Sequence, residues 1–420
     1  MRKTFLYFAI FVLFSGIVLT LLFNVLIKNW SEDFEFRQEA LSGEGQKALL
    51  LQASKKTTPY LKNQFEHKKI KVLIVPGHDS DSPGAEFLGV GEADLTLMTA
   101  EFLFELLRND SRFEVFLTRN KNGYQKEFSS YFQEKKNEII AFRDSFKNFM
   151  NLAFDVGVLK RERGVVHNSV YQDMSVKLYG INKWLNENDV DLVLHLHFND
   201  YPGHGSGPGE YSGFSIYVPE KQLPNSQASL EIAQAVLEKM KKYFAVSDYL
   251  QEAGGIIEDQ NLIALGANGS LDTPALLIEY GYIYEPQFLS DSLRPLILRE
   301  LALQTYAGVN QYFNRKVISE NGFSTFLLPH IWKEEIKEGN RNGDVLSLQA
   351  ALIQEGVYPP EGRGIKECSL TGSFRRCTQK AVAAFQEKYQ EEILTPLDLI
   401  SGSGFVGEAT LKKLNQLYGK

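Results

Sequence analysis

Residues 71–78 read Lys-Val-Leu-Ile-Val-Pro-Gly-His, so that a run of aliphatic residues ends at a Pro-Gly turn followed by His78. Short, continuous apolar runs of this kind are typical of the buried strands of parallel sheets. Two later apolar runs also end in ionisable residues, one at His197 and the other at Glu279. Because open α/β sheets bind ligands at the carboxyl ends of their strands, these residues are predicted to belong to one functional site.

The same stretch opens an alternation of strands and helices. Residues 95–107 place apolar side chains at helical spacing, and residues 113–119 are predicted to form the next strand. Further predicted strands lie at 191–199, 214–218 and 275–278. A strand, a helix and a second strand build a parallel unit. We therefore expect an α/β fold with a mixed, mostly parallel sheet flanked by helices.

Length and charge limit the number of units and the classes of partner. The chain has 420 residues, more than one core usually organises, so two folded units are expected. Its formal net charge is −7, and no long Lys/Arg stripe is interleaved with aromatic residues. Nucleic acid is therefore not an expected partner.

The N-terminus predicts a membrane location. Residues 4–27 are uncharged and mostly apolar, and as a helix they would measure about 36 Å, which is enough to span a bilayer. Arg2 and Lys3 precede this run, which favours a cytoplasmic N-terminus. We interpret residues 1–30 as an uncleaved, single-pass signal anchor, with the rest of the chain extracytoplasmic; a cleaved signal peptide is the alternative. The polar residues 31–67 suit a stalk.

Four residues provide the groups that a hydrolytic metal site requires. A catalytic zinc uses three protein ligands and keeps one position open, and His78, Glu92 and His197 offer imidazole and carboxylate ligands. Glu279 adds a carboxylate that can accept and return a proton. Taken singly, each of these residues is more often structural. His195 faces the same side of the strand as His197 and is therefore an alternative ligand.

The order and context of these residues resemble the zinc-dependent N-acetylmuramoyl-L-alanine amidases. The motifs that carry the resemblance are Pro76-Gly77-His78, Glu92-Ala-Asp-Leu-Thr-Leu97, Leu117-Thr-Arg119, His197-Phe-Asn199, Gly213-Phe-Ser-Ile-Tyr217 and Pro274-Ala-Leu-Leu-Ile-Glu-Tyr-Gly281.

The resemblance implies a catalytic domain at residues 68–315. It also implies Zn²⁺ held by His78, Glu92 and His197, with Glu279 as the catalytic carboxylate. The expected reaction is hydrolysis of the amide that joins N-acetylmuramic acid to L-alanine in peptidoglycan.

The resemblance also ranks the two histidines of the strand at 191–199. His195 stands where the family usually has a small hydroxyl residue, whereas Asn199 follows His197 as in the family pattern. This favours His197 as the ligand. His195 and Asn199 are then expected to support the site from beside the ligands.

Residues 120–175 form an insertion that is longer than the family's core requires and is predicted to be helical. One hypothesis is that the insertion caps the zinc cleft until an activator protein moves it. The alternative is a surface helical hairpin without a regulatory role.

The C-terminal region is predicted to be a separate unit. Residues 316–341 are interpreted as a linker, and residues 342–420 as a small three-helix module in which Asp344 caps the first helix. The sequence echoes itself, because Gly372 and Gly404 each stand six residues before a Thr that can cap the following helix. The module resembles the peptidoglycan-binding module found beside such amidases, and its ligand is implied by this resemblance alone. An unrelated helical bundle is the alternative.

The two cysteines of the chain lie within this module. Cys368 and Cys377 are expected to form a disulfide in an oxidising envelope, because two thiols without a nearby histidine make a poor zinc site.

The predicted function is zinc-dependent hydrolysis of peptidoglycan in cell-wall remodelling or daughter-cell separation. Two alternatives stay open. The first is a non-catalytic protein that anchors the membrane to the wall, and the second is a zinc peptidase that acts within the stem peptide.

Overall fold

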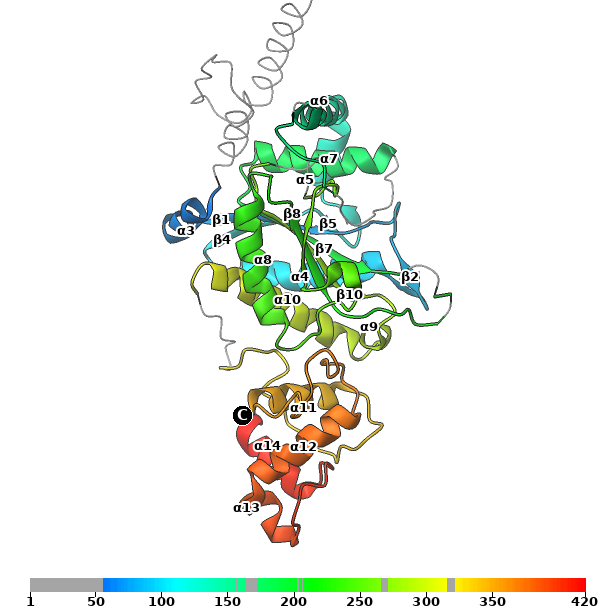
Figure 1. The fold of residues 1–420 in the computed structure, drawn as a ribbon, viewed down its shortest axis with the longest axis vertical. Coiled ribbons are helices and arrows are strands. Elements are labelled where there is room, and N and C mark those ends of the chain that lie inside the picture. The colour runs from blue at the N-terminus through cyan, green and yellow to red at the C-terminus, as the bar shows by residue number, and fades with distance from the viewer. Residues whose placement is uncertain are drawn as a thin grey trace, which may run out of the picture.

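The computed structural model describes residues 56–155, 157–162, 172–201, 204–205, 207–265, 271–315 and 322–420. A six-stranded sheet forms the centre of the larger of two units (Figure 1). Its strands lie in the order β4-β1-β7-β10-β8-β9. Their bounds are β1 (Ile70–Pro76), β4 (Phe113–Leu117), β7 (Leu192–Asn199), β8 (Ser215–Pro219), β9 (Ile256–Asp259) and β10 (Ala275–Tyr282).

The sheet is mixed and mostly parallel, which confirms the predicted fold class. Only the β10–β8 pair is antiparallel among the paired strands of the described sheet. In the parallel β7–β10 pair, Glu279 lies directly opposite His197. The register therefore brings two of the predicted site residues to the same end of adjacent strands.

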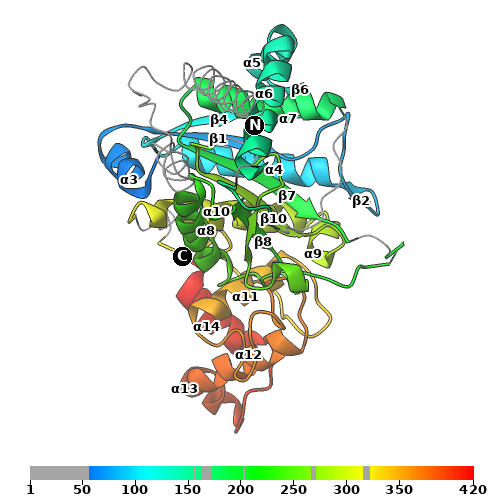
Figure 2. The same cartoon turned by 45° about the horizontal axis from the view of Figure 1, so that its top comes forward.

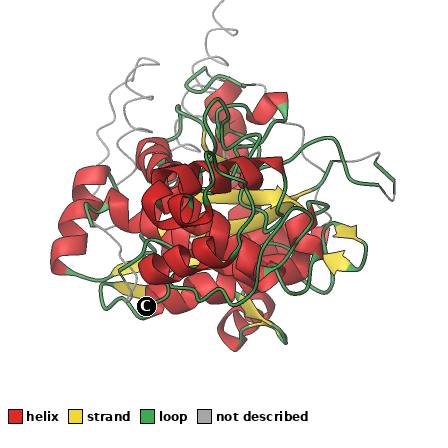
Figure 3. Cartoon of the chain, turned by 90° about the horizontal axis from the view of Figure 1, so that it is seen from below, coloured by secondary structure: helices red, strands yellow, loops and turns green. Residues whose placement is uncertain are grey.

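Helices cover both faces of the sheet, and Figure 3 shows the strands enclosed between them. On β1, Val72 and Ile74 pack into one core, while Leu73 and Val75 pack into another with Trp184. This alternation reflects the two-residue period of a strand. The first face is covered by α4 (Glu92–Arg108), α8 (Ser226–Met240) and α10 (Arg294–Tyr312), and the second by α7 (Gln172–Glu187).

The N-terminal part of the described chain is helical. Helix α3 (Thr58–His67) buries Leu61 and Phe65 in the main core, so the folded unit starts before the predicted boundary at residue 68. Two apolar side chains four positions apart lie on the same face of a helix, so that this face can pack against the core. The polar composition of the segment as a whole concealed this pair. The predicted anchor at residues 1–30 lies outside the described residues. Among the described helices, none is long and apolar enough to cross a membrane.

The insertion is helical in its described part, as the sequence predicts. It consists of a short hairpin of β5 (Arg119–Asn120) and β6 (Gly123–Tyr124), followed by α5 (Lys126–Glu134) and α6 (Lys136–Asp155). Both helices contact α7, and α6 lies beyond α7 as seen from the sheet (Figure 1). The helices of the insertion therefore form an additional layer on one face of the catalytic unit.

The C-terminal unit consists of helices and loops in its described residues. Its longer helices are α11 (Gly343–Gln354), α12 (Arg376–Lys388) and α14 (Glu408–Tyr418), with the single turn α13 (Gln390–Ile393) between the last two. The side chain of Asn342, rather than the predicted Asp344, caps α11 by accepting the backbone N–H of Val345 at 3.0 Å.

Part of the predicted linker belongs to this C-terminal unit. Trp332 is 2% exposed, and its indole N–H donates to the carbonyl of Asp344 at 2.9 Å. Ile336 bridges Val406, and both side chains are buried. The core of the module therefore starts before the predicted boundary at residue 342, because apolar side chains upstream of α11 cover its helices.

The sequence echo corresponds to a repeated hydrogen-bond network. Gln349 donates to the Thr378 hydroxyl at 3.0 Å and accepts the N–H of Gly372 at 2.9 Å. Gln386 repeats this pattern with Thr410 and with the N–H of Gly404, each at 3.0 Å. Each threonine thus bonds to a glutamine of the preceding helix. The prediction that the threonines cap their own helices is therefore wrong.

A disulfide joins Cys368 and Cys377, with their Cα atoms 5.8 Å apart. Cys377 lies in the first turn of α12 and Cys368 in the preceding loop. The bond therefore fixes this loop to the helix.

The two units touch at the C-terminal end of α8. The backbone N–H of Leu370 donates to the carbonyl of Tyr243 at 3.0 Å, and the Gln354 amide donates to the Tyr243 hydroxyl at 3.1 Å. Buried apolar residues of both units form one continuous core cluster. The module is therefore packed against the catalytic unit (Figure 1).

Candidate metal centre

His78 is presented by the turn that follows β1. Gly77 lies against the imidazole of His197, and a Cβ atom at this position would be 2.4 Å from the ring. His78 itself has a φ of 61°, in the left-handed region, and its Nδ1 lies 3.1 Å from the carbonyl oxygen of Ser82. The Pro-Gly-His turn therefore requires a glycine at this position so that the two histidines can approach each other.

Glu92 opens α4 and lies between the two histidines. Its Oε2 is 3.2 Å from His78 Nε2, and its Oε1 is 3.1 Å from His197 Nδ1. The backbone N–H groups of Ala85 and Phe198 donate to the same carboxylate at 3.1 and 3.2 Å. Burial opposes its ionisation, but the hydrogen bonds from His197 and His78 outweigh it and hold the pKa of Glu92 well below its usual range.

These three side chains fit a metal ion. One ligand atom from each residue can be chosen so that all three lie within 4.8 Å of one another. Ligands about 2.0 to 2.2 Å from a tetrahedral zinc ion would be about 3.4 Å apart, close to the separations observed here. Two imidazoles and one carboxylate also match the donor set of catalytic zinc sites that keep an open position.

Glu279 lies beside this group on β10, opposite His197 in the register. Its Oε2 atom is buried and has no hydrogen-bond partner among the described residues. Burial, followed by the negative charges of Glu92 and Glu252, raises the pKa of Glu279 well above its usual range. An enclosed carboxylate oxygen without a partner suits a group that exchanges a proton with a bound molecule.

Arg119 and Lys177 hold the loop that carries His78. The guanidinium of Arg119 donates to the carbonyl oxygens of Gly77 and Ala93 at 2.9 and 2.8 Å. The ammonium of Lys177, on α7, binds the carboxylates of Asp79 and Asp81 at 2.8 and 2.9 Å. Arg119 was noted in the sequence only as part of a motif, and the role of Lys177 was missed because it depends on a contact across about 100 positions.

Glu252 is a further buried group that the sequence did not indicate. It is 1% exposed and accepts hydrogen bonds from the Asn199 amide at 2.9 Å and the Tyr217 hydroxyl at 2.7 Å. The Tyr282 hydroxyl donates to its second oxygen at 3.1 Å. Asn199 is therefore directed towards Glu252, and no motif or spacing marks Glu252 in the sequence.

The remaining histidines of this region lie outside the ligand group. His195 is 3% exposed and is not part of the cluster, and its Nε2 has no hydrogen-bond partner among the described residues. Burial and the nearby His197 lower the pKa of His195 to about 3. His204 bonds to Asp200 at 2.9 Å and to the carbonyl of Gly207 at 2.8 Å.

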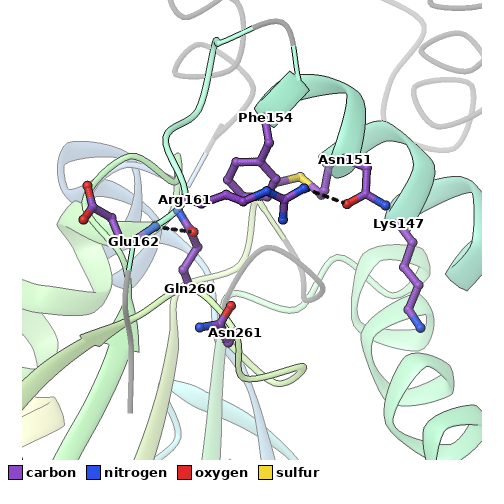
Figure 4. A pocket seen from close by; sticks show the side chains of 8 residues that line it. Lys147, Asn151, Phe154, Arg161, Glu162, Gln260 and Asn261 are labelled. Carbon is purple, nitrogen blue, oxygen red and sulfur yellow. Dashed lines mark hydrogen bonds between the residues drawn. The ribbon is translucent and has the colours of Figure 1, made fainter. Parts of the chain in front are cut away.

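A shallow pocket lies between α6 and the loop that follows β9 (Figure 4). Lys147, Phe154, Arg161 and Gln260 are among the residues that line it. Since β9 runs antiparallel to β10, its carboxyl end lies at the opposite end of the sheet from Glu279. The pocket is therefore separate from the candidate metal centre.

Comparison with known proteins finds a family model that matches part of this chain. Residues 156–311 match the family model described as N-acetylmuramoyl-L-alanine amidase, a range that includes His197 and Glu279. A curated protein of Buchnera aphidicola subsp. Schizaphis graminum (strain Sg), provisionally named as the same amidase, is 27% identical over 265 residues. The matched region covers 59% of this chain and 98% of that protein.

The solved structures that are similar to this chain include two amidases. The CwlD amidase from Clostridioides difficile, in complex with the GerS lipoprotein, is 14% identical with a TM-score of 0.38, covering 59% of this chain and 99% of that one. An N-acetylmuramoyl-L-alanine amidase from Clostridium difficile 630 is 19% identical with a TM-score of 0.36, covering 60% and 100%.

Proposed function

We propose that this chain is an N-acetylmuramoyl-L-alanine amidase, which the match over residues 156–311 supports, and that it hydrolyses peptidoglycan with a zinc ion bound by His78, Glu92 and His197. The observation that carries this proposal is the convergence of the three ligand groups beside Glu279. A bound zinc ion would supply a Lewis acid that polarises the amide carbonyl and lowers the pKa of water.

Glu279 is the proton carrier in this proposal. The oxygen of a water molecule bonds to the lactyl carbonyl carbon while Glu279 takes a proton from that water. The carbon–nitrogen bond then breaks as Glu279 passes that proton to the alanine nitrogen, which leaves a lactyl carboxylic acid and a free amine. A divalent cation nearby would counteract the rise in the pKa of Glu279 and favour the ionised carboxylate that accepts the proton.

The two other readings predict different products. A peptidase would cut within the stem peptide, and a binding protein would cut nothing. Purified wall material digested with the full chain is therefore expected to release peptides that begin with L-alanine and to leave free lactyl groups. Other peptide ends would indicate a peptidase, and the absence of new ends would overturn the catalytic proposal.

The metal requirement is tested separately. Removal of the metal with a chelator is expected to abolish release of these peptides, and stoichiometric Zn²⁺ is expected to restore it. Metal analysis of the chain should find one zinc ion per molecule, and a His197→Ala variant should retain little of it. A His195→Ala variant that loses zinc while His197→Ala keeps it would reverse the assignment.

The proposal extends to the location and architecture of the chain. The apolar residues 4–27 support a single-pass anchor in the cytoplasmic membrane that places the amidase in the cell envelope. The resemblance of the C-terminal unit supports a module that binds peptidoglycan beside the site. Its role would then be cell-wall remodelling or daughter-cell separation.

The helices of the insertion support a regulatory proposal. The helices α5 and α6 pack on α7. Lys177 of α7 in turn binds Asp79 and Asp81 in the loop that carries His78. An activator protein that shifts α5 and α6 would therefore act on the metal site through α7. If the insertion restrains activity, a folded variant without residues 126–155 should hydrolyse faster than the intact chain; unchanged or slower turnover would overturn this proposal.

A further inference from the structure

Three tyrosines form a half-exposed aromatic patch near the proposed active site. The ring centroids are 4.6 Å apart for Tyr201 and Tyr211, 4.9 Å for Tyr211 and Tyr249, and 5.6 Å for Tyr201 and Tyr249. None of the three is fully buried, and Leu250, next in the chain, is 84% exposed. We call Tyr201, Tyr211, Tyr249 and Leu250 the tyrosine patch.

The patch lies at the same end of the sheet as the metal ligands. Tyr201 follows Asn199, the last residue of β7, which is also the strand of His197. Tyr249 precedes the short helix of Glu252, and Glu252 accepts the amide of Asn199. The patch therefore borders the strand ends that hold His197 and Glu279. Figure 2 shows the two strands, β7 and β10, side by side.

Buried aromatic residues support the patch from beneath. Tyr282, which is 1% exposed, lies 6.3 Å from Tyr211 and 5.5 Å from Tyr284 between ring centroids. The ring of Tyr284 packs against Gly209, where an added Cβ atom would lie 2.2 Å from it. This contact packs the loop of Tyr211 against a buried surface.

The charges around the patch exclude acidic ligands. Each tyrosine directly follows an acidic residue in the sequence, namely Asp200, Glu210 and Asp248. The sequence has no Lys or Arg between Asn199 and Pro219 or between Ala245 and Asp259. Within these two segments, phosphates and peptide carboxylates would meet like charges and no lysine or arginine.

Two of the three acidic groups have partners within the protein, which reduces their attraction for a cationic ligand. Asp200 bonds to His204 at 2.9 Å, and Asp248 accepts the backbone N–H of Ser212 at 2.8 Å. An uncharged ligand with flat apolar faces and hydroxyl groups fits this surface best. Tyrosine rings supply an apolar face with a hydroxyl at the edge, and they lose little conformational entropy on binding.

We infer that the tyrosine patch is a subsite for the sugar rings of the glycan strand, next to the residue whose amide is cut. This inference rests on the proposed amidase function, because that reaction requires a glycan strand beside Glu279. The C–H face of each pyranose ring packs on a tyrosine ring, whose face carries the negative part of the aromatic quadrupole. The acidic and cationic groups of the stem peptide extend away from the patch.

The inference is tested by varying glycan length and peptide length separately. Two substrates carry the same stem peptide, one on a single N-acetylmuramic acid and the other on a strand of several disaccharides. Tyr211→Ala and Tyr249→Ala are compared in the full chain with Tyr211→Phe, which keeps the ring, and with Tyr60→Ala. Tyr60 is a suitable control because it is a half-buried tyrosine on α3, remote from the strand ends of the site.

Each alanine variant is expected to raise KM for the long strand by about threefold to tenfold more than for the single sugar, as loss of an aromatic contact predicts. The phenylalanine and Tyr60 variants should leave the ratio of the two KM values unchanged, and thermal unfolding confirms that all variants fold.

Three outcomes overturn the subsite. The first is an equal change on both substrates, the second is no change on either, and the third is an effect that follows the length of the peptide, which would indicate a cationic peptide ligand. If the unmodified chain cleaves neither substrate, the proposed function fails instead. The substrate with a single sugar distinguishes that failure, because it requires no subsite.

Discussion

The catalytic unit and the C-terminal module differ in how far apart in the sequence their key contacting residues lie. The site gathers His78, Glu92, His197 and Glu279 from separate segments by means of strand register. The module depends on contacts between neighbouring helices, such as those from Gln349 to Thr378 and from Gln386 to Thr410. Chemistry in the first unit is therefore sensitive to single side chains, whereas the fold of the second depends on a repeated packing unit.

The largest effect is expected at Glu279. A Glu279→Gln variant should lower kcat by about 10²-fold to 10⁴-fold, since the amide cannot carry the proton. Zinc content and thermal unfolding should stay close to those of the unmodified chain. Glu258→Gln is the matched control, because Glu258 is exposed on β9 at the other end of the sheet. Loss of zinc in the Glu279 variant would show that Glu279 helps to bind the metal.

Glu300 tests the junction between the two units. This buried residue of α10 accepts the hydroxyl of Thr325 and the N–H of Phe326, each at 2.9 Å, and burial raises its pKa to about 7. A raised pKa means that the folded protein holds the proton of Glu300 more tightly than the unfolded chain does. This contribution to stability is fully present below the unfolded pKa of about 4.5 and is lost as the pH rises through about 7.

Stability is therefore expected to fall by roughly 3 kcal/mol across that window. In thermal unfolding measured against pH, Glu300→Gln should flatten this part of the profile. Glu334→Gln, at an exposed position, should leave the profile unchanged. An unchanged profile for Glu300→Gln would assign the pH dependence to other groups.

The disulfide is expected to contribute to the stability of the module. A Cys377→Ser variant should lower the free energy of unfolding of the module by about 2 to 3 kcal/mol, because the bond closes a loop with a sequence separation of 9. Chemical denaturation should show this loss, while kcat on a single-sugar substrate stays the same. A fall in kcat would contradict the separation of roles between the two units.

The smallest effect is expected within the repeated network. A Gln386→Ala variant removes the bonds to Thr410 and Gly404 and should destabilise the module by about 2 kcal/mol. Gln390→Ala changes the same residue type at an exposed position nearby and should have little effect. Equal unfolding midpoints for the two variants would show that the network does not stabilise the module.

The boundaries of the folded units could be predicted only in part. The polar composition of residues 58–67 concealed the two apolar side chains that attach α3 to the core, Leu61 and Phe65. The predicted linker likewise contains Trp332 and Ile336, which are buried in the module. Short segments that pack through one or two side chains show no periodic pattern of apolar residues. The first segment was therefore predicted to be part of a stalk and the second to be a linker.

The sequence by itself determined the mixed, mostly parallel sheet and drew attention to His78, Glu92, His197 and Glu279. These features are visible because strands and helices impose local periods on apolar residues, and because His78, His197 and Glu279 stand at the ends of apolar runs. Glu92 begins α4 and was marked by the motif around it. The predicted metal site is therefore tied to strand ends that can be read from the sequence alone.

Only the tertiary structure identified Glu252, Lys177 and the tyrosine patch as neighbours of the site. Each depends on contacts between segments that are far apart in the chain: Glu252 with Asn199, Lys177 with Asp79, and Tyr201 with Tyr249. Local patterns do not specify such contacts, because they arise only when the strand order and the loop paths are set by packing of the whole core.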